Sequence, residues 1–300
     1  MTIQILPLPI MHIYQPKDWF TFIFKVHKSE TFQKLLPMML LIAIYTWAVV
    51  YAEFEWLHWD RDPFVKHLTT VQTLLGFVLS LLLVFRTNTA YDRWWEGRKM
   101  WGSMVNDSRN FISKLSVLDL TTEERDYFEN HFPLFTVCAK EHLRGQRLIA
   151  PEFMSPEDRT SFEKATHQAL WVVLSLRGKL QDLRARGIMD SIELSMLNQN
   201  LDRLVDSLGA CERIRNTPIP FSYSLFIKKF IFIYVITMPL AFVELFGYYS
   251  AFISTFVFYA LVSMELLAEE IEDPFGYDDN DLPTDQISEV IKQDLDEIMA

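Results

Sequence analysis

The chain has 300 residues, half of them hydrophobic, and 39 acidic against 28 basic side chains give it a formal net charge of −11 at pH 7. This apolar content is enough for an extensive core. The acidic excess argues against a nucleic-acid-binding protein, because that partner requires a concentrated basic face. The two cysteines, Cys138 and Cys211, are too few for a disulfide framework, and we expect both to be small buried residues in a reducing compartment.

The hydrophobic residues are segregated into four stretches along the chain. The first two, 35–52 and 68–85, are each eighteen residues long without a charge, about the length that a helix needs to cross a hydrocarbon core of roughly 30 Å. Two weaker stretches follow at 230–243 and 251–267, and the first of them is long enough only if the preceding residues join it. Four transmembrane helices in two hairpins are the simplest interpretation.

The charges that flank these stretches predict an orientation. Lys and Arg gather before the first stretch, after the second and before the third, whereas the connector 53–67 carries two basic residues and the connector 244–250 carries none. Positively charged flanks stay on the cytoplasmic side. We therefore expect a multi-pass protein of the plasma membrane or bacterial inner membrane, surrounded by lipid, with both termini in the cytoplasm.

This pattern divides the chain into four parts. We expect an N-terminal cytoplasmic segment with the first transmembrane hairpin at 1–85 and a cytoplasmic helical region at 86–224. The second transmembrane hairpin follows at 225–267, and an acidic cytoplasmic segment completes the chain at 268–300.

The middle region shows helical signals and few strand signals. Thr121 and Glu124 have the spacing of a capping box, and Ser155 followed by Pro156 is typical of a helix start. Gly187 is expected to separate two helices. The second of these carries a predicted apolar face of Leu197, Leu201, Leu204, Val205 and Leu208. The sequence therefore predicts an all-α membrane protein with a cytoplasmic helical bundle.

A stripe of bulky side chains runs along the second apolar stretch. Phe77, Leu81 and Phe85 lie at positions i, i+4 and i+8, which makes a stripe about 12 Å long on one helix face. If several copies packed in a ring, this stripe would face the axis as an apolar constriction that gates ions by dewetting. Ordinary helix packing is the alternative, and the spacing alone favours it. Small residues flank the stripe and would let another helix approach closely: Gly76, Ser80 and Val84.

The segment 269–283 is unusually rich in acids. Oxygen ligands on a flexible turn suit calcium rather than zinc, although the spacing is not that of an EF-hand. A helix that ends at Asp273, before Pro274, places carboxylates at the negative end of its dipole, so a cation or basic side chain must neutralise them. The alternative is a solvated acidic turn paired with cytoplasmic Arg and Lys.

Enzyme signatures are weak by comparison. The sequence has no phosphate-binding glycine loop and no nucleophile elbow, and its seven histidines show no metal-ligand spacing. We expect no catalysis. Two other hypotheses stay open: a non-conducting membrane scaffold, and a metal-dependent membrane enzyme that holds a divalent ion on Glu272, Asp273, Asp278 and Asp281.

Two stretches together resemble the bestrophin family of ion channels. The run 75–88, followed by 91–96, resembles the family's pore helix and its exit, and 272–283 resembles the signature that follows its last membrane helix. The two stretches occur in the family's order, about 180 residues apart. The short chain resembles the bacterial members.

The resemblance implies a homopentamer with one axial pore, four membrane helices per subunit and a helical cytoplasmic portion. It implies passive conduction of small monovalent ions, chloride by the family's name, through a neck formed by Phe77, Leu81 and Phe85. It also places a cytoplasmic constriction at Ile192. Because the neck stripe is uncharged and the family has members of both kinds, a monovalent-cation channel is the alternative.

Animal relatives bind calcium in a clasp around the second signature. The corresponding positions here are Glu270, Asp273, Asp278 and Asp281, and all four offer oxygen ligands. The acidic run of the animal proteins is interrupted in this chain, and many bacterial relatives do without the metal. Calcium is therefore a candidate ligand, and no cofactor is expected to be required.

Overall fold

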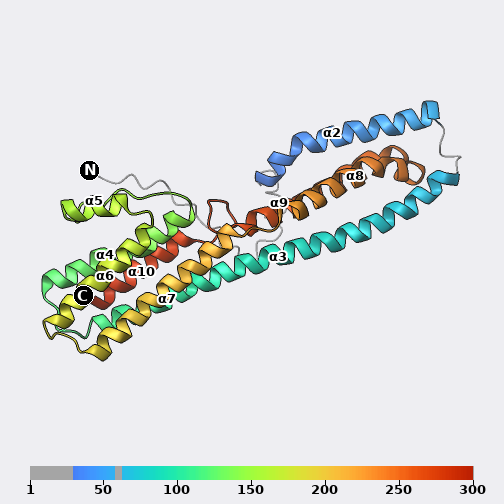
Figure 1. Cartoon of the computed structure of the whole chain (residues 1–300). Helices are drawn as coiled ribbons and strands as arrows, with labels where there is room; N and C mark the ends of the chain where they lie inside the picture. The colour runs from blue at the N-terminus through green and yellow to red at the C-terminus, as the bar shows by residue number, and fades with distance from the viewer. Residues whose placement is uncertain (1–29, 58–62, 300) are drawn as a thin grey trace. The chain divides into compact units, whose positions relative to one another are not determined.

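The computed structural model describes residues 30–57 and 63–299, in which every regular element is a helix (Figure 1). Most of the basic residues before the first apolar stretch and part of the connector 53–67 lie outside the described residues. The described elements are α2 (Glu30–Ala52), η3 (Glu53–Leu57), α3 (Pro63–Leu115), α4 (Thr122–Leu143), α5 (Pro156–Lys164), α6 (Gln168–Ala185), α7 (Ser191–Asn216), α8 (Phe221–Phe246), η5 (Gly247–Tyr249), α9 (Ser250–Glu272) and α10 (Thr284–Met299).

These helices form two compact units. The apolar unit contains the described residues up to Asp92 together with Pro218–Glu272, and the bundle unit contains Arg93–Thr217 and the chain from Asp273 onward. Helix α3 contributes to both units, because it does not end where its apolar stretch ends at residue 85 but continues to Leu115. The divisions that hydropathy predicts at 85 and 267 lie several residues before the unit boundaries at Asp92 and Glu272, whereas the division at 224 lies several residues after the boundary at Thr217.

The apolar unit contains all four predicted apolar stretches as helices. Three helical segments are long and apolar enough to cross a membrane: Thr31–Leu57, His67–Leu115 and Phe221–Glu272. The third turns at Gly247, whose φ of 48° suits glycine, and its two halves α8 and α9 pack against each other. The one segment thus comprises the third and fourth predicted stretches.

Polar side chains tie the helices of the apolar unit together. The Gln72 side chain donates a hydrogen bond to the Tyr234 carbonyl oxygen at 2.8 Å, and the Thr69 hydroxyl donates to the Ala241 carbonyl oxygen at 2.8 Å. Both bonds link α3 to α8. Such bonds help to hold apolar helices together where the hydrophobic effect between them is weak.

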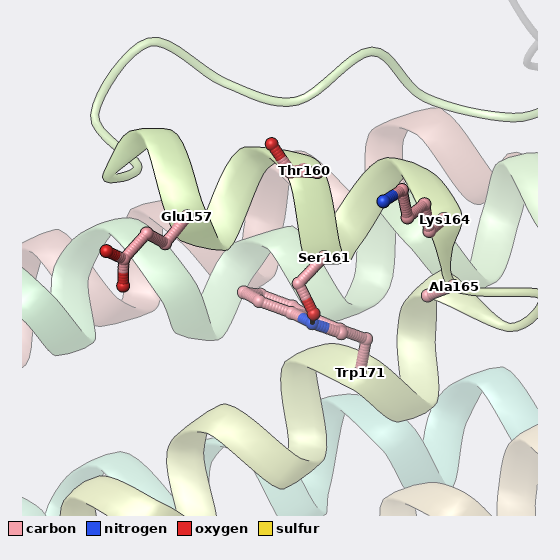
Figure 2. Close-up of a pocket in the computed structure, with 6 residues that line it drawn as sticks. All are labelled: Glu157, Thr160, Ser161, Lys164, Ala165 and Trp171. Atoms are coloured by element: carbon pink, nitrogen blue, oxygen red, sulfur yellow. Dashed lines mark hydrogen bonds between the residues drawn. The ribbon is translucent and has the colours of Figure 1, made fainter.

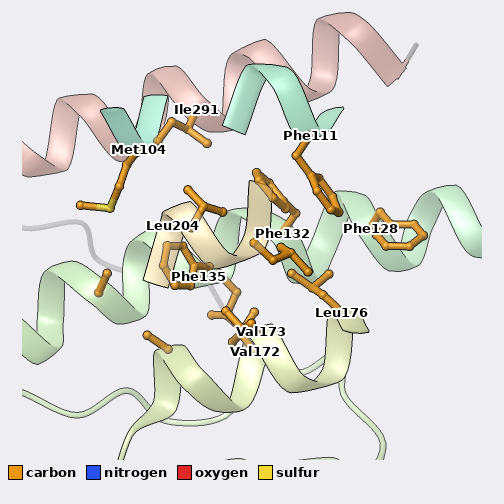
Figure 3. Close-up of a cluster of buried hydrophobic side chains, with 14 of the residues drawn as sticks. Met104, Phe111, Phe128, Phe132, Phe135, Val172, Val173, Leu176, Leu204 and Ile291 are labelled. Carbon is orange, nitrogen blue, oxygen red and sulfur yellow. The ribbon is translucent and has the colours of Figure 1, made fainter. Parts of the chain in front are cut away.

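The bundle unit has a large aromatic and aliphatic core between α3, α4, α6, α7 and α10 (Figure 3). The rings of Phe111 and Phe132 stack with their centroids 4.7 Å apart. The predicted apolar face of α7 is confirmed, since its four leucines are buried and Val205 is partly buried. Burial of these side chains is the main stabilising contribution to the unit.

The local helix signals of the bundle unit are also confirmed. Thr121 and Glu124 form the predicted capping box at the start of α4, and Ser155 caps α5. Gly187 has a φ of 79° and separates α6 from α7. Cys138 and Cys211 are free and buried, and burial raises the pKa of each thiol to about 12.

Candidate functional site

The predicted neck stripe is exposed on α3 of the apolar unit. The exposed fractions of Phe77, Leu81 and Phe85 are 64%, 43% and 61%, whereas Leu79 and Leu83 on the same helix are buried. Helix α3 therefore uses one face to pack within its own unit and leaves the bulky stripe uncovered by its own chain. The stripe can therefore contact lipid, pack against another copy of the chain or line a pore.

The small flank of the stripe is partly used within the chain itself. A Cβ added at Gly76 would lie 2.7 Å from the Tyr234 hydroxyl of α8, so the glycine permits this close approach. Ser80 and Val84 are exposed, and the Ser80 hydroxyl donates a hydrogen bond to the Gly76 carbonyl oxygen at 2.8 Å. Only the part of the flank at Ser80 and Val84 is left for another copy to pack against.

A buried charge cluster follows the stripe directly. Arg86 is fully buried, and its Nη2 lies 2.7 Å from Glu272 Oε2, while its Nε lies 3.6 Å from Oε1 of the buried Glu265. The sequence placed Arg86 in the run 75–88, which resembles the family's pore helix, and did not connect it with these acids. The signal that could have found the cluster is Glu265, the single charge within the stretch 251–267. A charge inside an apolar segment requires a partner.

Two of the acids at the end of α9, Glu269 and Glu272, have the basic partners that the helix dipole favours. Helix α9 ends at Glu272, one residue before the predicted end at Asp273. Arg86 neutralises Glu272, which also accepts a hydrogen bond from the Ile219 amide at 2.6 Å. Lys228 pairs with Glu269 one turn earlier. The expectation of basic partners at this helix end is therefore confirmed.

The two stretches that resemble family signatures meet in the bundle unit. The Trp94 indole donates a hydrogen bond to the Asn280 carbonyl oxygen at 2.9 Å. A Cβ at the neighbouring Gly97 would lie 3.1 Å from the Phe275 ring and 3.2 Å from Leu282, both of which are buried. Through these contacts, residues 94–97 and residues 275–282 complete each other's packing.

The acidic turn is organised around Asp281. The Asp278 amide donates a hydrogen bond to Asp281 Oδ2 at 2.7 Å, and the Asp281 amide donates to the Asp278 carbonyl oxygen at 3.0 Å. Burial raises the pKa of the Asp281 carboxyl to about 7, and nearby Asp278 and Asp273 add to this. Its Oδ1 is buried without a hydrogen-bond partner. Of the other predicted calcium ligands, Asp273 and Asp278 are exposed, and Glu270 is half-buried in the apolar unit.

Helix α10 is attached next to this turn by ion pairs. The Asp285 carboxylate accepts hydrogen bonds from Lys140 at 2.6 Å and from Arg144 at 2.6 Å. The Arg144 guanidinium also lies over the Tyr277 ring, 4.5 Å from its centroid. Burial opposes ionisation of Asp285, but the bonds from Arg144 and Lys140 outweigh it and lower the pKa of this carboxyl. Asp285 lies two residues after the acidic run 269–283, so these contacts attach the start of α10 and do not test how that run is neutralised.

The predicted cytoplasmic constriction, Ile192, is the second residue of α7. The Asp190 carboxylate accepts hydrogen bonds from the Ile192 amide at 2.7 Å and the Glu193 amide at 2.8 Å, and Glu193 completes a capping box. The Ile192 side chain has an exposed fraction of 69%. A well-capped helix start thus holds an exposed apolar side chain in the bundle unit.

An open surface pocket lies between α5 and α6 of the bundle unit (Figure 2). The Trp171 indole donates a hydrogen bond to the Ser161 hydroxyl at 3.0 Å, and its ring meets Phe162 edge to face at 5.4 Å. None of the predicted site residues lines this pocket, and its contacts are those of helix packing.

Known proteins match almost the entire chain. Residues 11–297 match the family described as Bacterial/Fungal Bestrophin protein. A voltage-dependent anion channel-forming protein of Nostoc sp. strain PCC 7120 is 37% identical over 241 residues, covering 76% of this chain and 78% of the relative. The voltage-dependent anion channel-forming protein YneE of Escherichia coli strain K12 is 30% identical over 288 residues, covering 95% and 93%.

Solved structures agree with this match. A variant of a bacterial bestrophin homologue from Klebsiella pneumoniae has a TM-score of 0.81 at 26% identity, covering 89% of this chain and 99% of that structure. The resemblance carried by the stretches 75–96 and 272–283 is thus confirmed across nearly the full length. The chain belongs to the family of bacterial and fungal bestrophins.

Proposed function

We propose that the protein is a membrane channel that conducts small monovalent anions, chloride among them, passively down their electrochemical gradient. The observation that carries this proposal is the family membership, because relatives that match most of the chain are named anion channel-forming proteins. The names describe channels rather than enzymes. The uncovered stripe on α3 supplies side chains suited to line such a channel.

The proposed assembly is a homopentamer around one axial pore. Each subunit crosses the membrane four times, with α2, the first part of α3, α8 and α9, and both termini lie in the cytoplasm. The apolar segments that contain these helices support this topology, as does the excess of Lys and Arg in their cytoplasmic flanks.

The neck consists of Phe77, Leu81 and Phe85 from each subunit. Three uncharged rings of side chains hold water poorly when they are close together, so the neck opens by displacement or rotation of these side chains. An apolar ring does not distinguish the sign of an ion. Ion selection is therefore made elsewhere along the axis. Ile192 forms a second, cytoplasmic constriction.

Calcium binding at the acidic turn is a further part of this proposal. Asp273, Asp278 and Asp281 would supply oxygen ligands, with Glu270 as the fourth predicted ligand. The buried Oδ1 of Asp281, which has no hydrogen-bond partner, supports a cation here. Titrating calcium during a conductance measurement tests this part, since no response up to millimolar calcium and no bound metal would reject it.

The channel proposal is tested by reconstituting the pure protein in planar bilayers with a salt gradient across the membrane. We expect current with a reversal potential close to the chloride equilibrium potential. An intact oligomer that passes no current contradicts channel function. A reversal potential near the cation equilibrium potential would instead establish the alternative of a cation channel.

The neck assignment is tested by alanine substitution of its three residues. Phe77→Ala, Leu81→Ala and Phe85→Ala remove the apolar barrier, so we expect larger basal conductance or loss of gating, with assembly preserved. Phe232→Ala is a matched control, because this phenylalanine on α8 has the same exposed fraction of 64% as Phe77. Equal conductance in the neck variants and the control would show that the stripe only packs.

A further inference from the structure

The bundle unit brings together two histidines and a glutamate that the sequence did not connect. Nε2 of His142 and Nε2 of His167 each lie 2.7 Å from the same atom, Oε1 of Glu212. The two imidazole rings stack with centroids 4.3 Å apart and planes inclined by 29°. The three donor atoms lie within 4.8 Å of one another, and among the described residues this is the one such group of metal-ligating side chains.

Three helices position these side chains. His142 lies in the last turn of α4, His167 is the N-cap of α6, and Glu212 lies in the last two turns of α7. The Arg215 guanidinium donates a hydrogen bond to the His142 carbonyl oxygen at 2.9 Å, which fixes the backbone beside the cluster. The cluster therefore stands on regular elements whose mutual packing is set by the bundle core.

We propose that His142, His167 and Glu212 form a binding site for a divalent transition-metal ion of the Zn²⁺ class. Such ions prefer imidazole nitrogen together with carboxylate oxygen. Calcium takes oxygen ligands, so the two imidazole nitrogens make this site unsuitable for it. None of these three residues belongs to the proposed neck or to the acidic turn.

Exposure gives the ion access and a further ligand. The side chains of His142, His167 and Glu212 are 32%, 23% and 28% exposed. This partial burial leaves the donor atoms in reach of solvent, so an ion can enter and a water molecule can complete a four-coordinate shell. A two-histidine, one-glutamate set with an open fourth position is a known arrangement for zinc.

Small movements convert the hydrogen-bonded cluster into a metal site. Ligand atoms bound to zinc at about 2.0–2.1 Å in a tetrahedral shell are roughly 3.3 Å apart, so the two 2.7 Å contacts must open slightly. The Leu170 amide donates to His167 Nδ1 at 3.3 Å, which leaves the His167 proton on Nε2. When Nε2 binds the metal, that proton moves to Nδ1 and the long capping bond is given up.

Metal binding would tie together α4, α6 and α7. Helix α7 also carries Ile192 at its first turn, twenty residues before Glu212. A metal at this cluster therefore fixes the helix that presents the predicted cytoplasmic constriction.

The site is tested by metal binding to the full-length protein after chelator treatment, with Zn²⁺ or Co²⁺ alone as the probe. We expect one ion per subunit, a higher melting temperature with Zn²⁺, and the intense visible absorption of four-coordinate Co²⁺. His167→Asn keeps a side chain able to cap α6 but removes the imidazole, and Glu212→Gln removes the carboxylate. Both variants should weaken Zn²⁺ binding at least tenfold and lose the Co²⁺ spectrum.

Controls separate this cluster from other ligands. His67→Gln removes an exposed histidine of the apolar unit, and Asp278→Asn removes an acid of the acidic turn. Both controls should bind Zn²⁺ as the unaltered protein does. The proposal is overturned if the unaltered protein binds no Zn²⁺, or if His167→Asn and Glu212→Gln bind it with unchanged stoichiometry and affinity while remaining folded.

Discussion

Arg86 places a full charge in the interior of the apolar unit, within a helix that is otherwise apolar for eighteen residues before it. Desolvating a guanidinium is unfavourable, and the two acids of α9 offset that cost. The pairing links α3 to α9 and fixes their register at the end of the neck stripe. The value of the pairing to the protein is therefore positional, since apolar residues in place of all three charged side chains could pack there without partners.

Arg86→Met is expected to destabilise the protein strongly. It leaves Glu265 and Glu272 without their buried cation, which costs roughly 3–5 kcal/mol in free energy of unfolding. Thermal unfolding in detergent measures the change. Arg98→Gln, at an exposed position of α3, is the control and should have little effect. A melting temperature for Arg86→Met equal to that of the control would show that the pair does not stabilise the fold.

The buried carboxyl of Asp281 is expected to make the stability of the protein depend on pH. Burial raises the pKa of its carboxyl to about 7 in the folded protein, against about 4 in the unfolded chain. A raised folded pKa gives a contribution to stability that is complete below pH 4 and is lost as the pH rises through about 7. The ionised carboxylate therefore destabilises the protein at pH 8.

Asp281→Asn should raise the melting temperature more at pH 8 than at pH 5. The difference corresponds to roughly 1–3 kcal/mol, because the contribution of the carboxyl falls over about two pH units, between pH 5 and its folded pKa of about 7. The measurement uses calcium-free buffer, so that metal binding does not contribute. Asp279→Asn is a control at the same turn, where the side chain is exposed. Equal effects of Asp281→Asn at both pH values would contradict a raised pKa.

At the scale of elements, α10 is attached to the bundle by an apolar face and a polar anchor. Ile291, Leu295 and Met299 are buried, and the Arg125 guanidinium donates a hydrogen bond to the Met299 carbonyl oxygen at 3.0 Å. Asp285 anchors the other end through Lys140 and Arg144 of the α4 region. The helix is thus held at both ends and along its middle.

Asp285→Asn should loosen the first turn of α10. Loss of the charged hydrogen bonds from Lys140 and Arg144 costs about 1–3 kcal/mol at pH 7. Because the folded pKa of Asp285 is lowered, its contribution is present above about pH 4 and declines as the pH falls through the folded value. Hydrogen exchange of α10 amides measures the loosening. Asp296→Asn breaks only an exposed pair with Lys292 and should leave exchange unchanged.

At the scale of the whole molecule, the exposed apolar surface of one chain requires lipid or further copies to cover it. The proposed pentamer predicts a protein mass of about 177 kDa, five times the subunit mass of 35.4 kDa. Native mass spectrometry of the detergent-solubilised protein measures this directly. A stable assembly with another number of subunits would contradict the pentamer but leave the channel proposal testable by conductance.

The sequence by itself determined the helical class, the four apolar stretches and the helix starts at Thr121 and Ser155. These features depend on hydrophobic content, on the period of the apolar residues and on helix capping. Each of these signals is carried by residues close together in the sequence. It also determined the family, because the stretches 75–96 and 272–283 are specific in composition and order.

Only the tertiary structure decided which distant side chains meet. The pairing of Arg86 with Glu265 and Glu272, and the cluster of His142, His167 and Glu212, join residues far apart in the chain, so no local spacing reveals them. Hydropathy likewise could not predict that α3 continues to Leu115, because a helix can continue after its apolar residues end. Contacts between helices depend on packing angles and side-chain volumes, and these are properties of the folded chain.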